Sequence, residues 1–195
     1  MHVTADGVLL AFHDDHLDRV TDREGEIAAL PWSEVRKAKV DGREPIPLLA
    51  DLLGTWPDLR VNIDPKHDAA VEPLAEVIDA TGAVDRVCVG SFSDRRIDRA
   101  RALLGPRLCT SLGPLGILRL QLGLRPPGGV ACAQIPVAAG PVTVLTPRLL
   151  RHARRRGIPV QVWTIDAPDE MHRLLDLEVD GIMTDRPAVL KQVLV

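Results

Sequence analysis

The sequence predicts an α/β fold in which parallel strands alternate with helices. From about residue 45 onward, short apolar runs alternate with stretches that have the apolar spacing of amphipathic helices. The runs are apolar on both faces, which is typical of strands buried in a parallel sheet. Polar residues follow several of the runs directly, so they lie at carboxyl strand ends. A chain of 195 residues can bury one substantial core, and we expect a single domain over residues 1–195.

The expected elements follow from these patterns in chain order. An opening hairpin pairs residues 1–4 with residues 8–12 across an Asp6-Gly7 turn. Further strands are expected at 60–64, 86–90, 107–110, 130–135, 159–165 and 179–183. Helices are expected at 46–54, 69–80, 94–104, 115–122, 147–156, 167–177 and from residue 187 onward. Residues suited to N-caps precede four of these helices: Asp68, Ser93, Thr146 and Asp166.

This alternation favours a TIM (β/α)8-barrel over an open doubly wound sheet. An open sheet would give the same alternation, but no Gly-x-Gly-x-x-Gly follows the first strand to support one. A complete barrel takes about 250 residues, and six strands plus the opening hairpin fall short of eight full units. We therefore expect a TIM barrel that lacks its first strand–helix unit and most of its second strand.

Composition narrows the functional classes. The net charge of −3 is too small to indicate nucleic-acid binding by bulk charge. An arginine cluster at 148–156 could mark a nucleic-acid patch, but the leucines among it favour a solvated helix face. Cys88, Cys109 and Cys132 lie in apolar runs and are interpreted as reduced core residues. With no apolar stretch near 18 residues and no leader pattern, we expect no membrane span and a cytoplasmic location.

Two segments carry candidate chemistry. His13 ends an apolar strand and can transfer a proton near neutral pH. Taken alone, however, the triplet Phe12-His13-Asp14 favours a hydrogen-bonded strand end without a catalytic role. Asp64 and Lys66 point to the same side of the strand at 60–64. A carboxylate suits Ca²⁺ or Mg²⁺, although these two residues alone would favour a surface ion pair. His67 follows them and is interpreted as a bystander.

Residues 4–25 resemble the segment hxTxDGxxVxxHDxxLxRxTxxxG of glycerophosphodiester phosphodiesterases. Shorter matches follow in the same order as in that family: residues 62–66 resemble N-I-E-x-K, 91–93 resemble SF[ST], 133–136 resemble a less specific segment of the sixth strand, 162–166 resemble VWTV[ND], and 180–187 resemble DGI[IM]TDxP. The resemblance covers the whole chain. It implies a TIM barrel that hydrolyses glycerophosphodiesters to an alcohol and glycerol 3-phosphate with the help of a divalent cation.

The resemblance also assigns roles to residues. It implies that His13 is one of the two histidines that act as general acid and base, and that Lys66 faces the phosphate. Asp64 stands where the family has a glutamate ligand of the cation, Ca²⁺ or Mg²⁺. Trp163 would line the glycerol pocket, and Ser91 would contact substrate at its strand end. The implied partner is a small glycerophosphodiester in phospholipid and glycerol metabolism, and no nucleic acid.

Two features of the family have no counterpart in residues 1–195: an upstream Glu-x-Asp strand and a His-Arg-Gly strand. One hypothesis is an ordinary enzyme whose coding region begins upstream. The alternative is a catalytically inactive barrel that binds a phosphorylated ligand or a protein partner. The presence of His13, Lys66 and Trp163 favours the enzyme. For the 195 residues alone, we expect little phosphodiesterase activity and self-association through the open barrel edge.

Overall fold

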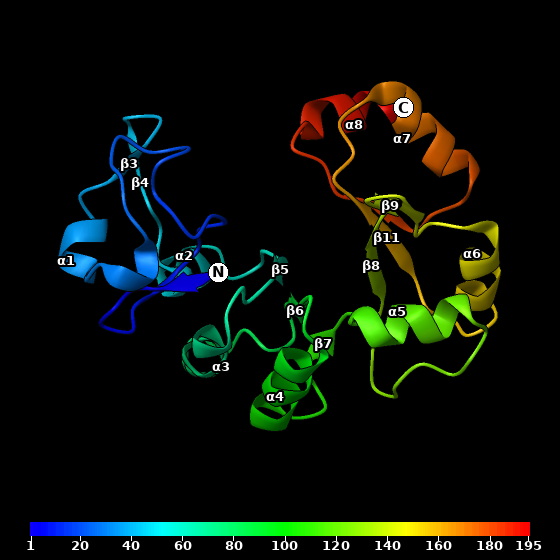
Figure 1. Cartoon of the computed structure of the whole chain (residues 1–195), viewed down its shortest axis with the longest axis horizontal. Coiled ribbons are helices and arrows are strands. Elements are labelled where there is room, and N and C mark those ends of the chain that lie inside the picture. The colour runs from blue at the N-terminus through cyan, green and yellow to red at the C-terminus, as the bar shows by residue number, and fades with distance from the viewer. The chain divides into compact units, whose positions relative to one another are not determined.

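The structure is a computed structural model that describes all residues, 1–195. It divides into two compact units, residues 1–109 and residues 110–195 (Figure 1). Each unit has its own elements and core and is described by itself.

The first unit opens with the expected hairpin. Strands β1 (His2–Val3) and β2 (Leu9–Leu10) pair antiparallel. Gly7 adopts a φ of 85° in the turn, where a side chain would be strained. Short elements that were not predicted come next: a 3-10 helix (Ile27–Ala29), α1 (Trp32–Val35), and the antiparallel pair β3 (Lys39–Val40) and β4 (Glu44–Pro45).

The rest of the first unit consists of strand–helix units. Its elements are α2 (Leu49–Thr55), β5 (Val61–Ile63), a 3-10 turn (Asp68–Ala70), α3 (Val71–Ala80), β6 (Val87–Val89), α4 (Asp94–Leu104) and β7 (Cys109–Thr110). The sheet has the order β5-β6-β7, and β5 and β6 are parallel with Ile63 opposite Val89. Leucines of α2 and α3 pack on this sheet, and Leu49, Leu53 and Leu74 are fully buried.

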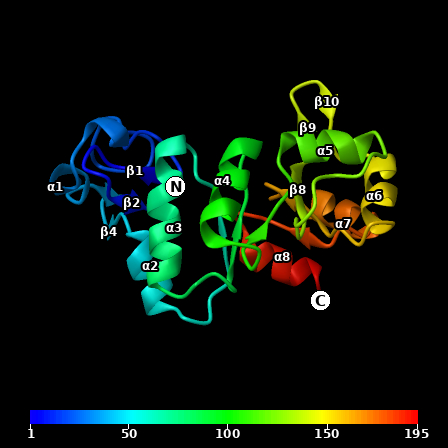
Figure 2. The same cartoon turned by 90° about the horizontal axis from the view of Figure 1, so that it is seen from below.

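The second unit repeats the alternation around another parallel sheet. Its elements are α5 (Pro114–Gln121), β8 (Ala133–Pro136), the hairpin β9 (Ala138–Ala139) and β10 (Val142–Thr143), α6 (Pro147–Arg154), β11 (Val160–Trp163), α7 (Pro168–Asp176), β12 (Gly181–Ile182) and α8 (Pro187–Val193). β11 lies between β12 and β8 and is parallel to both. Helices α5 and α6 contact each other (Figure 2).

The predicted strand–helix alternation is confirmed, and the predicted caps are confirmed in part. Thr146 accepts a hydrogen bond from the Leu149 amide at 3.1 Å, as a capping residue does. Ser93 occupies the N-cap position of α4 without a side-chain cap bond. Asp68 and Asp166 do not cap: the Asp68 carboxylate pairs with Arg95 and Arg96, and that of Asp166 accepts from Thr184 and Asp185. Both carboxylates are held by residues distant in sequence.

Two further expectations can be compared with the structure. None of the three cysteines forms a disulfide; Cys132 is buried, and Cys88 and Cys109 are partly buried. The hydrogen-bonded strands form several short sheets and no closed barrel. None of the helices has the length and apolar character required to cross a membrane.

Candidate functional site

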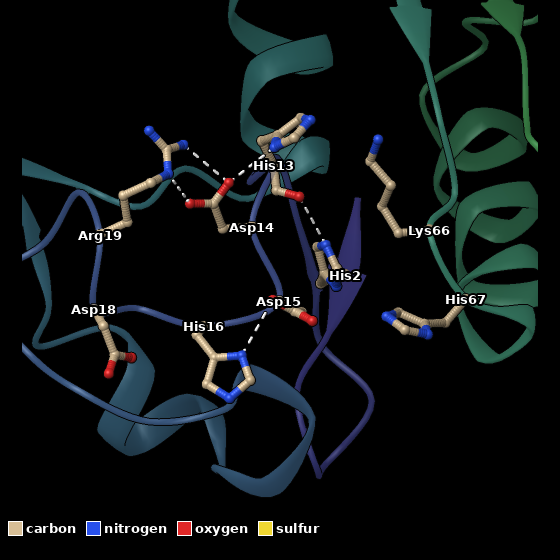
Figure 3. Close-up of a pocket in the computed structure, with 9 residues that line it drawn as sticks. All are labelled: His2, His13, Asp14, Asp15, His16, Asp18, Arg19, Lys66 and His67. Atoms are coloured by element: carbon tan, nitrogen blue, oxygen red, sulfur yellow. Dashed lines mark hydrogen bonds and ion pairs between the residues drawn. The ribbon is translucent and has the colours of Figure 1, made fainter. Parts of the chain in front are cut away.

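An open pocket of about 460 Å³ lies in the first unit, beyond the end of β2 (Figure 3). Its lining is polar and includes four histidines. The lining residues are His2, His13, Asp14, Asp15, His16, Asp18, Arg19, Lys66 and His67. The pocket thus joins the opening hairpin, the loop after it and the loop after β5, which brings the predicted residues His13 and Lys66 to one place.

His13 is held by a chain of charged hydrogen bonds. Its Nδ1 lies 2.8 Å from Asp14 Oδ1, and Arg19 donates to both Asp14 oxygens, at 2.5 Å from Nε and 2.9 Å from Nη2. The hydrogen bonds from Arg19, and then that from His13, hold the pKa of the Asp14 carboxyl well below its usual range. An ionised carboxylate only accepts, so His13 Nδ1 carries the proton and Nε2 is the basic nitrogen.

The His13 ring itself is open to the solvent, with 78% of its side chain exposed, whereas Asp14 is only 17% exposed. Phe12 is buried in the core of the hairpin and fixes the main chain just before His13. The carboxylate that orients His13 is thus partly buried while the His13 ring is accessible, which suits a group that must meet a small substrate.

His2 is hydrogen-bonded to the main chain of His13 from the buried side. It is almost fully buried, and its Nε2 lies 2.9 Å from the carbonyl oxygen of His13. A carbonyl only accepts, so Nε2 is the donor in this bond. Burial lowers the pKa of His2. The His67 ring packs against the His2 ring with a centroid separation of 5.2 Å, and His67 is one of the residues that line the pocket.

Lys66 reaches the pocket from the loop after β5. The main chain there is fixed to residue 1: the Met1 α-ammonium donates to the Asp64 carbonyl at 2.7 Å, and the Lys66 amide donates to the Met1 carbonyl at 3.2 Å. The Lys66 Nζ donates to Asp64 Oδ2 at 2.6 Å, and both side chains are partly buried. Lys66 is a pocket residue, whereas Asp64 serves here as its counter-ion.

The residues present do not form a complete site for a divalent cation. Asp64 offers one carboxylate, and no group of three or more His, Cys, Asp or Glu side chains is arranged to hold a metal ion. Ca²⁺ and Mg²⁺ need six or more oxygen ligands. A cation at Asp64 requires ligands beyond those that residues 1–195 place there.

The other two predicted site residues lie apart from the pocket lining. Ser91 donates from Oγ to the Pro65 carbonyl at 3.4 Å and accepts from the Ser93 amide at 3.3 Å, so it braces the loop next to Lys66. Trp163 ends β11 in the second unit and is partly buried there. Their roles in substrate binding stay predictions.

Sequence reasoning missed several pocket residues. Arg19 was visible as the arginine of the LxRxT part of the motif, and its contact with Asp14 follows from the loop that returns toward the hairpin. No sequence pattern marked His2 or His16 as site residues. His16 lies 3.1 Å from Asp15 Oδ1, and that hydrogen bond raises the pKa of His16.

Comparisons with known proteins agree with the sequence resemblance. The model of the "Glycerophosphoryl diester phosphodiesterase family" matches residues 1–111 and 124–189. A Mycobacterium tuberculosis protein named "Probable glycerophosphodiester phosphodiesterase 2" is 42% identical over 205 residues, which cover 100% of this chain and 77% of that protein. A glycerophosphodiester phosphodiesterase of Caldanaerobacter subterraneus is 28% identical, covering 97% of this chain and 82% of its own.

A solved structure supports the fold class. An Oleispira antarctica phosphodiesterase in complex with the product sn-glycerol-3-phosphate has a TM-score of 0.81 at 20% identity, covering 98% of this chain and 81% of that one. At this identity the likeness concerns the fold, and it supports the predicted α/β barrel class.

Proposed function

The chain belongs to the glycerophosphoryl diester phosphodiesterase family, and we propose on that basis that it hydrolyses glycerophosphodiesters to an alcohol and glycerol 3-phosphate. The observation that carries the proposal is the pocket in which His13, oriented by Asp14 and Arg19, shares one wall with Lys66. Phosphodiester cleavage uses proton transfer and positive charge near the phosphoryl oxygens, and His13 and Lys66 offer one group of each kind.

In the proposed hydrolysis, the oxygen of a water molecule attacks phosphorus and the P–O bond to the leaving alcohol breaks, which leaves glycerol 3-phosphate. The attacking oxygen loses a proton and the alcohol oxygen gains one. His13 Nε2 is suited to one of these transfers, because Asp14 holds the proton on Nδ1 and stabilises the imidazolium that forms. Lys66 Nζ places a positive charge near the phosphoryl oxygens.

The second transfer and the cation need groups that this pocket does not supply. We propose that full activity requires the Glu-x-Asp and His-Arg-Gly strands that the family resemblance places upstream of residues 1–195, and that Asp64 is one ligand of a Ca²⁺ or Mg²⁺ ion. Ser91 and Trp163 are proposed to contact the glycerol side of the substrate. We place the reaction in phospholipid and glycerol metabolism; a cytoplasmic location stays a prediction.

The test uses two proteins: the 195-residue chain, and the extended chain, defined as the same residues preceded by the N-terminal segment of the M. tuberculosis relative. Release of glycerol 3-phosphate from glycerophosphocholine is measured for both. We expect turnover by the extended chain and little by the 195 residues. His13→Ala should lower turnover by about 10²–10⁴-fold, whereas His172→Ala, an exposed histidine on α7, should not.

Absence of turnover by a folded extended chain, together with retained binding of glycerol 3-phosphate, would support the inactive binding protein instead. The family match and the intact His13–Asp14–Arg19 chain favour the enzyme over that alternative.

A further inference from the structure

Charge is distributed unevenly along the chain. Residues 110–165 contain seven arginines and no Asp, Glu or Lys, although the whole chain has a net charge of −3. The seven arginines are Arg119, Arg125, Arg148, Arg151, Arg154, Arg155 and Arg156. An asymmetry of this kind indicates an anionic partner.

One face of α5 is apolar and exposed within this basic region. Gly116 and Leu120 point into the core of the second unit, and Leu120 is fully buried. At about 100° per residue, positions 115, 118 and 122 form one stripe on the opposite side of the helix. These three leucines are 53%, 54% and 54% exposed, and Leu124 in the following loop is 51% exposed. The face of a surface helix opposite its buried face is normally polar.

Arginines border the leucines and are held there by the backbone. Arg119 donates from Nε to the Arg125 carbonyl at 2.8 Å, and Arg148 of α6 donates to the Leu122 carbonyl at 3.4 Å. Arg119, Arg125 and Arg148 form no ion pair with an acidic side chain. In the second unit, only Arg154 and Arg173 form such pairs. Their charges are therefore available to an external anion.

We propose that this leucine–arginine face (Leu115, Leu118, Leu122 and Leu124 with Arg119, Arg125 and Arg148) docks on the surface of an anionic phospholipid bilayer. The leucines would enter the boundary between headgroups and acyl chains, and the guanidinium groups would bind lipid phosphates. Figure 2 shows α5 along an edge of its unit beside α6, with the β9–β10 hairpin next to it.

Two other occupants fit less well. The phosphates of a nucleic acid would pair with the arginines. The exposed leucines would stay exposed, because the affinity of nucleic acids for proteins depends on phosphate contacts and base stacking. A second copy would cover the leucines, but a symmetric dimer places the same patch on both subunits and so brings the unpaired arginines together. A bilayer offers apolar acyl chains to the leucines and lipid phosphates to the arginines.

The experiment measures co-sedimentation of the full 195-residue chain with vesicles of pure phosphatidylcholine and of phosphatidylcholine with phosphatidylglycerol. We expect binding to the anionic vesicles that weakens as NaCl rises. The triple change Leu115→Ser, Leu118→Ser and Leu122→Ser should lower affinity at least about 10-fold. The triple change Arg119→Gln, Arg125→Gln and Arg148→Gln should lower it on the order of 100-fold, about fivefold for each arginine.

Matched variants in the first unit serve as controls. Leu59 and Leu103 are also exposed, at 45% and 41%, and changing both to Ser should leave binding intact. Changing the exposed Arg36, Arg43 and Arg60 to Gln should also leave binding intact. Equal loss in the controls, or no binding to anionic vesicles, would overturn the proposal.

Two further outcomes would also overturn it: capture of duplex DNA that is indifferent to the leucine changes, or a lipid-free dimer that the leucine changes dissociate. Circular dichroism checks folding of each variant. If the leucine variant unfolds, the arginine variant decides the question, because its side chains are exposed. Docking is measured without turnover and does not depend on the proposed activity.

Discussion

In the pocket of residues 1–109, charged side chains meet partners of opposite charge: Asp14 with Arg19 and Asp64 with Lys66. Residues 110–165 contain seven arginines and no Asp or Glu, and exposed leucines lie beside some of these arginines. Paired charges hold side chains in fixed positions, which a reactive group requires. Unpaired charges and exposed apolar groups attract an external surface. The contrast agrees with the two proposals, in which His13 and Lys66 of the first unit act on the substrate and the leucine–arginine face of the second unit docks on a bilayer.

The largest effect should follow from removing the carboxylate that orients His13. In the extended chain, Asp14→Asn replaces an acceptor by an amide that can also donate, so His13 can turn or take the other tautomer. We expect turnover to fall roughly 100-fold or more, within the range of general acid–base catalysis. Asp18→Asn is the matched control, since Asp18 lines the same pocket but bonds to the Gly25 amide. Equal losses in both variants would mean that charge alone matters.

The two faces of α5 offer a direct comparison within the second unit. Leu120 is fully buried and Leu118 is exposed. Leu120→Ala should destabilise the chain by about 2–5 kcal/mol, because it leaves a cavity. Leu118→Ser should change the free energy of unfolding by less than about 0.5 kcal/mol. Urea denaturation of the 195-residue chain measures both. A large loss for Leu118→Ser would show that its face is covered within the chain and is no docking surface.

The sequence predicted those parts of the molecule that depend on local pattern. Buried strands and amphipathic helices were found because each has its own periodicity, and Thr146 caps its helix with a neighbour only three residues away. Asp68 and Asp166 were predicted as caps, but distant partners hold their carboxylates. His13 and Lys66 were predicted through the family motif. His2 could not be, because its role depends on burial beneath His13 and contact with His67.

Lys66 and Asp64 should give separable effects on the extended chain. Lys66→Ala removes a charge next to the phosphate and should lower turnover about 10–100-fold, with no recovery in excess Ca²⁺ or Mg²⁺. Asp64→Asn should act through cation affinity, so excess cation should restore part of the activity, and EDTA should abolish the activity of the parent. If Asp64→Asn responds to cation like the parent, the assignment of Asp64 as a ligand is wrong.

The smallest effect concerns pH, and it contrasts two histidines of one pocket. Burial lowers the pKa of His2 below its ordinary 6.5; the Met1 ammonium and His67 act in the same direction, while Asp15 and the bond to the His13 carbonyl oppose it. The folded state therefore binds fewer protons at His2 than the unfolded state, and His2 reduces stability as pH falls through 6.5.

His16 acts with the opposite sign. Its bond to Asp15, aided by the charges of Asp18 and Glu26, raises its pKa above 6.5. His16 therefore contributes stability that is fully present below 6.5 and is lost as pH rises through its folded pKa. Thermal melts of the 195-residue chain at pH 5.5 and 7.5 test this. The melting temperature at the lower pH, relative to the higher, should rise in His2→Gln and fall in His16→Gln.

These shifts should be no more than a few degrees, and the His16 shift should be the smaller, because solvent screens the interaction of an exposed ring with Asp15. His172→Gln, at an exposed position on α7, should leave the difference unchanged. If His2→Gln and His16→Gln shift it in the same direction, burial is not what distinguishes the two rings. His2 would then be as accessible as His16 in solution, and His13 would lack the buried support that the pocket geometry gives it.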